Sequence, residues 1–329
     1  MTRSHPAYQP GRALLLAACV AAFAAVPLLV GDGYFLHVAV MALIFVVLAV
    51  SLDIVLGLAG LLSLGHTAFY AVGAYVAALL AIHYDTSFWL NMLVAAVVAG
   101  VLAYLLGLIV LNVRGHRFVI TTIAFAELGR LVAYNWTDVT GGQIGLPGIP
   151  KPTLALPGLG TVSFDSQTSF YYLAGAVAVL VILVAKWIAR SPLGWSMEAL
   201  RENERLAEAL GVNTRIIAIT AFVAGACLAG VAGTMYAHFI TFVSPDLFYF
   251  SVMTTVLLMV VLGGKSTIVG PAIGAIIFTA IPEGLRMASE YRLIIFGTIL
   301  VILVMGLPGG LAQLATIIST RIARHDARR

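Results

Sequence analysis

The stretch WLNMLVAAVVAGVLAYLLGLIVL, residues 89–111, contains no Asp, Glu, Lys or Arg. As an α-helix it is about 34 Å long at ~1.5 Å per residue, which is enough to cross the ~30 Å hydrocarbon core of a bilayer. Similar runs recur along the chain. Hydrophobic residues make up 61% of the 329 residues and the mean hydropathy is +1.05, whereas soluble domains are about 45–50% apolar. The sequence therefore predicts an all-α polytopic membrane protein.

The apolar runs predict about ten transmembrane helices. They lie near 13–30, 36–56, 66–82, 89–111, 118–135, 170–189, 216–240, 249–263, 267–283 and 292–306. Ten spans divide into two halves of five, and a half with an odd number of spans can repeat only with inverted topology, which is common in transporters. HTAFY at 66–70 and PDLFY at 245–249 enter the third and eighth spans in a similar way. This similarity favours two inverted five-helix halves.

The basic residues set the orientation, because Lys and Arg concentrate on the cytoplasmic side of membrane proteins. With both termini cytoplasmic, 14 of the 18 basic residues lie inside, three lie outside and Arg130 lies within a span. We therefore predict cytoplasmic tails at 1–12 and 307–329, an outward loop at 136–169 and a cytoplasmic segment at 190–215. The N-terminal run resembles a signal sequence, but it continues to Val30 and further spans follow, so we expect an uncleaved first helix.

Several short stretches resemble motifs of other classes of protein, such as a phosphate-binding loop, but none of them fully matches the motif. GGKST at 263–267 lacks the earlier glycine of a phosphate-binding loop, since Met259 stands there. Ser63 and His66 have no carboxylate nearby in the sequence, so we expect no enzyme activity. Cys19 and Cys227 lie in apolar runs and indicate neither a disulfide nor a metal site. The basic tail RIARHDARR is expected to bind anionic membrane lipid rather than nucleic acid.

The glycine-rich stretch GLAGLLSLGHTAFYAVGAY, residues 57–75, departs from a plain apolar helix. Its glycines favour either tight helix packing or a broken helix that lines a substrate path. A second glycine cluster, LGGKSTIVGPAIGA at 262–275, lies at the corresponding depth of the second half. Asp53 lies near the cytoplasmic end of the second span, where its carboxylate could reach interfacial water.

Glu127 and Arg130 lie three residues apart within the fifth span and therefore on one helix face. Such a pair either offsets its own burial, as a structural pair, or forms part of the wall of a pathway. The candidates for a translocation pathway come from the glycine-rich stretch and from the fifth span. They are Ser63, Gly65, His66, Thr122 and Glu127.

The segment 190–215 holds eight of the 32 charged residues of the chain. Residues 197–210 suit a helix, and Gly211 is placed to end it. Met197, Leu200, Ala207 and Leu210 form a partial apolar stripe beside charges of both signs. The segment is therefore either a solvated connector or a helix that docks onto a cytoplasmic protein.

The chain resembles the LivM-type permeases of branched-chain amino acid ABC importers. The resemblance rests on LLSLGHTAFYAVGAY (61–75), FVITTIAFAELGRLV (118–132), TGGQIGLPGIP (140–150), SPLGWSMEALRENERLAEALGVN (191–213) and VLGGKSTIVGPAIGA (261–275). It implies a multi-pass protein of the bacterial inner membrane that imports leucine, isoleucine or valine. Permeases for urea and short amides are similar, and an ion-coupled secondary carrier is the alternative of a different class.

The resemblance also implies the partners. These are a second homologous permease, two cytoplasmic ATPase subunits that bind the ATP, and a periplasmic binding protein that docks at the outward loop. No cofactor is expected in this chain itself. The segment 191–213 would carry the coupling helix that sits in an ATPase cleft, with the coupling residues Met197, Glu198, Leu200, Arg201, Glu202, Asn203, Glu204, Arg205, Glu208 and Gly211.

Overall fold

The structure is a computed structural model, and it describes residues 23–27, 33–111, 116–156, 160–284, 297, 298 and 310. The spans expected at 13–30 and 292–306 lie mainly outside these residues, and both tails lie entirely outside them apart from Gly310. At the other eight expected positions the structure has helices: α2 (Tyr34–Asp53), α3 (His66–Tyr84), α4 (Phe88–Val110), α5 (His116–Asn135), α7 (Gln167–Arg190), α10 (Thr214–Ile240), α11 (Phe250–Gly263) and α12 (Val269–Gly284).

Within the part of the chain that the structure describes, five helical segments are long and apolar enough to cross a membrane. They are Tyr34–Leu58, His66–Tyr84, Phe88–Val110, Gln167–Arg190 and Thr214–Ile240. The helices Phe250–Gly263 and Val269–Pro282 are apolar but shorter. Mostly apolar helices of this length satisfy their backbone hydrogen bonds internally, which is what a chain within a bilayer requires.

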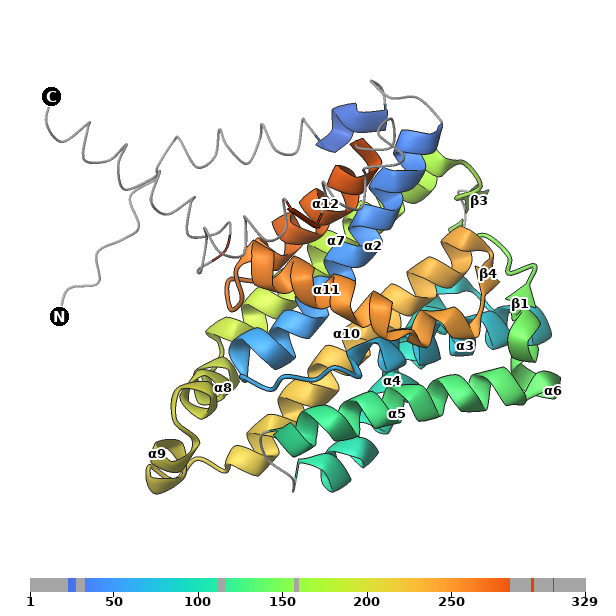
Figure 1. The fold of residues 1–329 in the computed structure, drawn as a ribbon. Helices are drawn as coiled ribbons and strands as arrows, with labels where there is room; N and C mark the ends of the chain where they lie inside the picture. The colour runs from blue at the N-terminus through green and yellow to red at the C-terminus, as the bar shows by residue number, and fades with distance from the viewer. Residues whose placement is uncertain are drawn as a thin grey trace, which may run out of the picture.

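Helix α10 lies at the centre of the bundle and packs against α2, α3 and α4 (Figure 1). The crossing of α3 and α10 is close because glycines face each other there. A Cβ at Gly73 would lie only 2.5 Å from the Cα of Gly230. Helix α2 packs against α7 on one side and α12 on the other, and α11 packs against α12. The core is therefore built from interleaved early and late segments of the chain.

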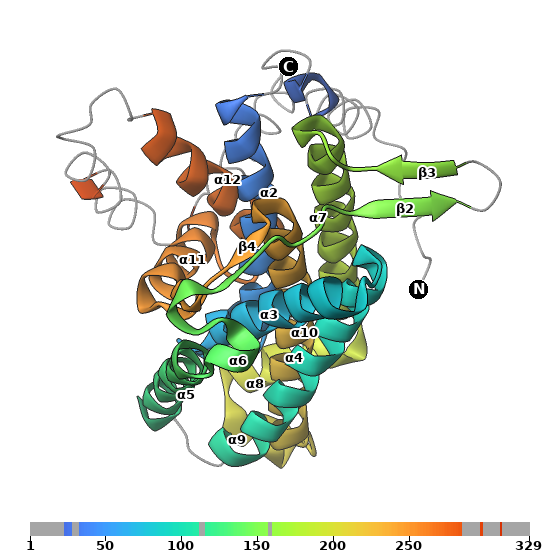
Figure 2. The ribbon, with the colours of Figure 1, turned by 90° about the vertical axis from the view of Figure 1, so that its right-hand side faces the viewer.

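The segment between α5 and α7 forms short elements instead of the plain turns expected from its glycines and prolines. They are α6 (Thr137–Thr140), η2 (Gly142–Ile144) and the strands β1 (Leu146–Pro147), β2 (Thr153–Leu156) and β3 (Gly160–Ser163). β2 and β3 pair with each other, and Figure 2 shows this hairpin projecting from the helices. β1 pairs antiparallel with β4 (Phe242–Val243), where Leu146 lies opposite Val243.

The described chain is mostly helical, as expected, and two small β-ribbons are added to the helices. Strand β4 is followed by η3 (Pro245–Phe248), which packs against α3 and α5. Buried His238 ties this end of α10 to the segment that carries β1. One ring nitrogen, Nδ1, lies 2.7 Å from the carbonyl oxygen of Pro150, and the other, Nε2, lies 3.4 Å from Nδ2 of Asn91.

The helices α8 (Pro192–Glu202) and α9 (Glu204–Ala209) lie at one end of the bundle, and α6 and β1 lie at the other (Figure 1). Between α2 and α3 the chain leaves the α-helical path. A π-helical turn, η1 (Ile54–Leu58), extends α2, and residues 59–65 are not helical before α3 begins. The glycine-rich stretch thus contains a break, at the end that carries α8, and also the tight packing of Gly73 against Gly230. That the break lines a substrate path stays a prediction.

Candidate functional site

The charged segment is two helices instead of the single helix expected over 197–210. Ser191 accepts a hydrogen bond from the Gly194 N–H and caps α8, and Pro192 follows at its first position. Asn203 then interrupts the helix, because its side chain accepts from the N–H of Leu206 and caps α9. The first of the two helices, α8, begins at Pro192, which is before the expected start at residue 197.

Gly211 ends α9 as expected. Its φ is +87°, its N–H donates to the Glu208 carbonyl oxygen, and the Val212 N–H donates to the Ala207 carbonyl oxygen. These two bonds define a Schellman motif, whose left-handed residue is usually glycine.

The apolar stripe of this segment faces the chain's own helices. Met197, Leu200 and Ala207 are buried, and α8 packs against α7, α10 and η1. Three of the four stripe residues therefore cannot form the docking seam expected from the sequence, since they already hold the segment on the bundle. The exposed apolar side chains are Leu206, at 58%, and Leu210, at 76%, together with Trp195. Periodicity found the stripe but could not show which way it faces.

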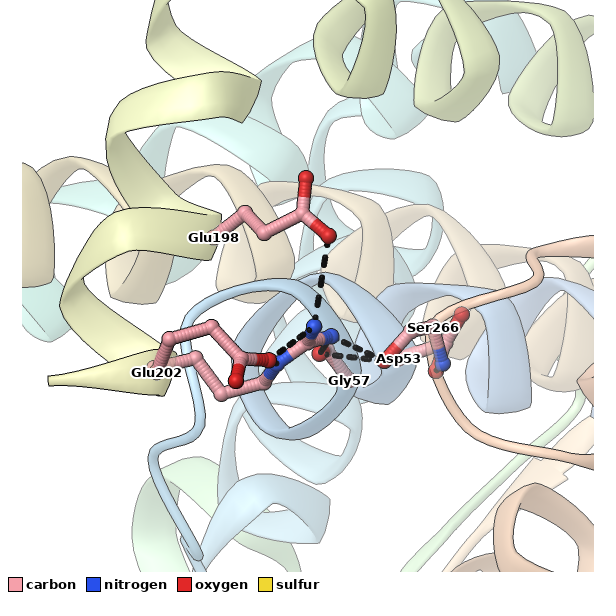
Figure 3. Close-up of polar contacts among 6 residues, drawn as sticks. Asp53, Gly57, Glu198, Glu202 and Ser266 are labelled. Carbon is pink, nitrogen blue, oxygen red and sulfur yellow. Dashed lines mark hydrogen bonds and ion pairs between the residues drawn. The ribbon is translucent and has the colours of Figure 1, made fainter. Parts of the chain in front are cut away.

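Arg201 links the segment to two other parts of the chain, at Gly57 and Ser266. Figure 3 labels these two partners together with Glu198 and Glu202. Its Nη1 donates to the Gly57 carbonyl oxygen, at 2.8 Å, and to Ser266 Oγ. Its Nη2 donates to Glu202, at 2.8 Å, and to Glu198, at 3.3 Å. The Arg201 side chain is only 23% exposed, whereas the two glutamates are mostly exposed. The inward side of Arg201 thus binds the bundle, and its outward side carries acidic groups.

Asp53 holds the turn that contains Ser266. The Asp53 side chain is fully buried instead of reaching interfacial water as expected. One oxygen accepts from the Ser266 N–H at 2.7 Å and the other from the Ile268 N–H at 3.1 Å. Ser266 and Ile268 have φ values of +70° and +60°, which non-glycine residues rarely adopt. The two hydrogen bonds to a carboxylate stabilise this unfavourable turn.

Sequence reasoning missed the roles of Gly57 and Ser266. The only signal was the pair of glycine clusters at 57–75 and 262–275, which the structure shows in direct contact. Gly57 has no room for a side chain, because a Cβ there would lie 2.6 Å from the Ser266 nitrogen. The Ser266 hydroxyl also donates to the Gly57 carbonyl oxygen at 2.6 Å.

Four of the five pathway candidates meet at the break before α3. The Leu64 N–H donates to Thr122 Oγ1 at 3.2 Å, and Gly65 lies against the Thr122 backbone. His66 Nε2 lies 2.9 Å from Ser51 Oγ. That hydroxyl donates to the Leu48 carbonyl oxygen, so the His66 ring must supply the proton of the pair. His66 therefore pairs with Ser51 and not with Ser63.

Ser63, Gly65, His66 and Thr122 are all buried within this chain. The Ser63 hydroxyl and His66 Nδ1 have no hydrogen-bond partner among the described residues. These side chains can shape the break, but they do not line an exposed surface of the described chain.

Glu127 is separate from these four residues and lies on the exposed face of α5. Both its carboxylate oxygens lie 3.0 Å from Nε of Arg130. The Glu127 side chain is 52% exposed and that of Arg130 is 20% exposed, and the Arg130 guanidinium lies 5.7 Å from the centre of the Tyr249 ring. The sequence correctly paired the two charges. The burial that would make the pair purely structural is not present in this chain.

A cavity of about 530 Å³ lies between the break and the charged segment. It is lined by residues from the break, from the start of α5, from α8 and α9 and from the start of α10, among them Gly60, His116, Arg201 and Arg215. No group of His, Cys, Asp and Glu in the described part of the chain is arranged to hold a metal ion. The described chain is therefore a helical bundle to which the α8–α9 segment is joined by helix packing and by the hydrogen bonds of Arg201.

The chain is similar in sequence to known transport proteins. Residues 34–304 match the family described as branched-chain amino acid transport system / permease component. The chain is 36% identical to the high-affinity branched-chain amino acid transport system permease protein LivM of Escherichia coli (strain K12), over 91% of this chain and 74% of that protein. It is 35% identical to LivM of Salmonella typhimurium over the same shares. It is 27% identical to the LivH permease of Escherichia coli (strain K12), over 81% of this chain and 90% of that protein.

No solved structure matches. The family match covers most of the chain, including α2 to α12 and the segment 190–215. With its long apolar helices, the protein is a multi-pass membrane protein. The chain therefore belongs to the permease family of the branched-chain amino acid transport systems.

Proposed function

We propose that the protein is a permease subunit of an ABC importer for leucine, isoleucine and valine in the bacterial inner membrane. In this proposal it pairs with a second, homologous permease, two cytoplasmic ATPases drive the cycle, and a periplasmic binding protein delivers the substrate. The observation that carries the proposal is the α8–α9 segment, which is anchored inward by Met197 and Leu200 and exposes Leu206 and Leu210 outward. Relatives named LivM and LivH support the substrate and the paired permeases.

The orientation follows from the basic residues. Placing α8 and α9 in the cytoplasm puts both termini inside and the segment 136–169, with its β2–β3 hairpin, in the periplasm. The ATPases would then meet α8 and α9, and the binding protein would meet the opposite end of the bundle.

The packing also supports ten spans in two inverted halves. Helix α4 packs against α10, and α12 packs against α2. In a five-plus-five arrangement these two contacts are equivalent, because α2 corresponds to α10 and α4 to α12. The contacts of α3 with α4 and of α11 with α12 are related in the same way. The break at 59–65 would then correspond to the interruption at 241–249 on the other side of the membrane.

The translocation path would run along the exposed face of α5. Charges within a bilayer are unfavourable against lipid and usually face another protein subunit or a water-filled cavity. Glu127 and Arg130 therefore point to a face covered by the second permease, with the path between the two subunits. The ion pair offers a positive and a negative charge to a passing zwitterion, while the buried Ser63, Gly65, His66 and Thr122 would hold the broken helix behind the path.

The first test concerns docking. Leu206→Asp with Leu210→Asp should prevent co-purification of the ATPases, because a charge would replace each exposed apolar contact. The control is Ile144→Asp, since Ile144 is 80% exposed and lies at the opposite end. Full recovery of the ATPases and full leucine uptake with the double variant would contradict the docking role of α8 and α9.

The second test concerns the substrate and the energy source. The reconstituted transporter with its binding protein should take up leucine only when ATP is present, and excess isoleucine or valine should compete. Uptake of urea in preference to leucine would replace the substrate. Uptake driven by an ion gradient without the ATPases would show a secondary carrier instead.

A further inference from the structure

One guanidinium group connects the charged segment to two glycine-rich breaks in the helices of the bundle. One is the break at 59–65, which follows η1, and the other is the turn at 264–268 between α11 and α12. Arg201 comes from α8, Gly57 from the end of η1, and Ser266 from the turn between α11 and α12. The three positions are far apart in the sequence, by 144 residues between Arg201 and Gly57 and by 65 between Arg201 and Ser266. The planar fork of arginine can serve acceptors from two elements at once, which a lysine ammonium does less specifically.

The two elements that Arg201 reaches are themselves joined. Both oxygens of Asp53 bind backbone N–H groups of the 264–268 turn, and the Ser266 hydroxyl binds the Gly57 carbonyl oxygen. A Cβ at Gly60 would lie 2.7 Å from Cγ of Arg201, so the arginine stem lies directly on the break. Arg201, the end of α2 and the turn before α12 are therefore joined by one continuous set of contacts.

From these contacts we propose that Arg201 is the positioning residue that transmits movement of α8 to both breaks, with Asp53 and Ser266 as the fixed link between them. This inference rests on the proposed function, since it assigns the path by which ATPase movement reaches the membrane helices. The breaks precede α3 and α12, so one displacement would act on both halves of the bundle.

A simpler role for Arg201 is to cap the carbonyl groups at the end of α2, where a cation is favourable. The two roles differ in what their loss changes. A cap affects only the amount of folded protein. A transmitting residue also affects how much substrate is moved for each ATP hydrolysed.

The test uses the assembled transporter in vesicles, with leucine uptake and ATP hydrolysis measured on the same sample. Arg201→Gln should leave ATPase recovery unchanged and lower uptake per ATP roughly tenfold or more, as expected for the loss of charged hydrogen bonds. Arg201→Lys should restore part of the ratio. Ser266→Ala should lower the ratio too. The double variant should be no worse than Arg201→Gln, because the two substitutions remove the same contact and their effects should not add.

The matched control is Arg190→Gln, an exposed arginine at the end of α7 that is not among the coupling residues. It should leave both ATPase recovery and uptake per ATP unchanged. Failure of the wild-type chain to recover ATPases would reject the proposed function. An unchanged uptake-to-ATP ratio in Arg201→Gln, or ATPase loss that Arg201→Lys does not repair, would reject the role of Arg201.

A second measurement does not depend on the folding of an Arg201 variant. Spin labels at the exposed positions Glu198 and Lys265 report the separation between α8 and the 264–268 turn. The inference expects this separation to stay the same in the ATP-free and ATP-bound transporter. A change in the separation on ATP binding would show that the segment and the turn move independently, and would overturn the proposal.

Discussion

Gly65→Ala should loosen the contact between the break and α5. A Cβ at Gly65 would lie 2.7 Å from the carbonyl carbon of Thr122, and the carbonyl oxygen is closer still, whereas ordinary contacts begin at 3.4 Å. The α5 backbone must therefore withdraw by roughly 1 Å, at a cost of about 1–3 kcal/mol for overpacking. The hydrogen bond from Leu64 to Thr122 would weaken, which adds about 0.5–1.5 kcal/mol.

Alanine also lowers the conformational entropy of the unfolded chain, which offsets about 0.4–1 kcal/mol of this loss of stability. The net loss of stability is therefore about 0.5–4 kcal/mol, dominated by the overpacking. The control is Gly107→Ala, where the nearest atom to a Cβ would be 3.5 Å away. An alanine within that helix should stabilise it by roughly 0.5–1 kcal/mol.

The assay is a titration of the purified chain in mixed micelles with denaturing detergent, scored by loss of helicity, with leucine uptake measured in parallel. The two variants should shift the unfolding midpoint in opposite directions, and only Gly65→Ala should reduce uptake. Equal stability of the two variants would refute the close packing of the break against α5.

Three further predictions follow from exposure and hydrogen bonding. Asn203→Cys should be protected from an impermeant thiol reagent in intact cells with a permeable outer membrane, and Asp138→Cys should react; the reverse pattern would invert the orientation. Glu127→Ala should reduce uptake with little loss of folded protein, and Glu127→Ala with Arg130→Ala should not restore transport; restored transport would make the pair structural. His238→Leu should destabilise the β1–β4 end by about 1–3 kcal/mol, because its buried partners lose their bonds, and faster proteolysis of the 136–166 segment would report this.

The transmembrane helices were predictable because bilayer thickness imposes a minimum length on an apolar run. The run 89–111 matches α4 to within one residue at each end. The end of the apolar run at 36–56 was less predictable. Its continuation IVLGL is equally compatible with an α-helix and with the π-helical turn observed at Ile54–Leu58. A pattern of apolar residues carries no information on which backbone hydrogen bonds close.

The site was predictable only in part. The charged segment and the Glu127–Arg130 pair could be recognised because their residues are near one another in the sequence. Asp53 and Ser266 are 213 residues apart, so their contact depends on how distant helices pack. The interruption at Asn203 did have a local signal, since asparagine is a favoured N-cap, but the helix-forming residues on both sides outweighed it.

The π-helical turn η1 amounts to one extra residue wound into the end of α2. Its bond from the Ala59 N–H to the Ile54 carbonyl oxygen closes a wider ring than an α-helical bond and turns the following residues out of phase. Removal of a single residue between Ile54 and Leu58 would let this turn close as a regular α-helix, so the carbonyl groups at the end of α2 would point along the α-helical path. The Gly57 carbonyl would then no longer face Arg201. A one-codon deletion could thus disconnect the α8–α9 segment from the membrane helices while leaving every side chain of the contact in the sequence.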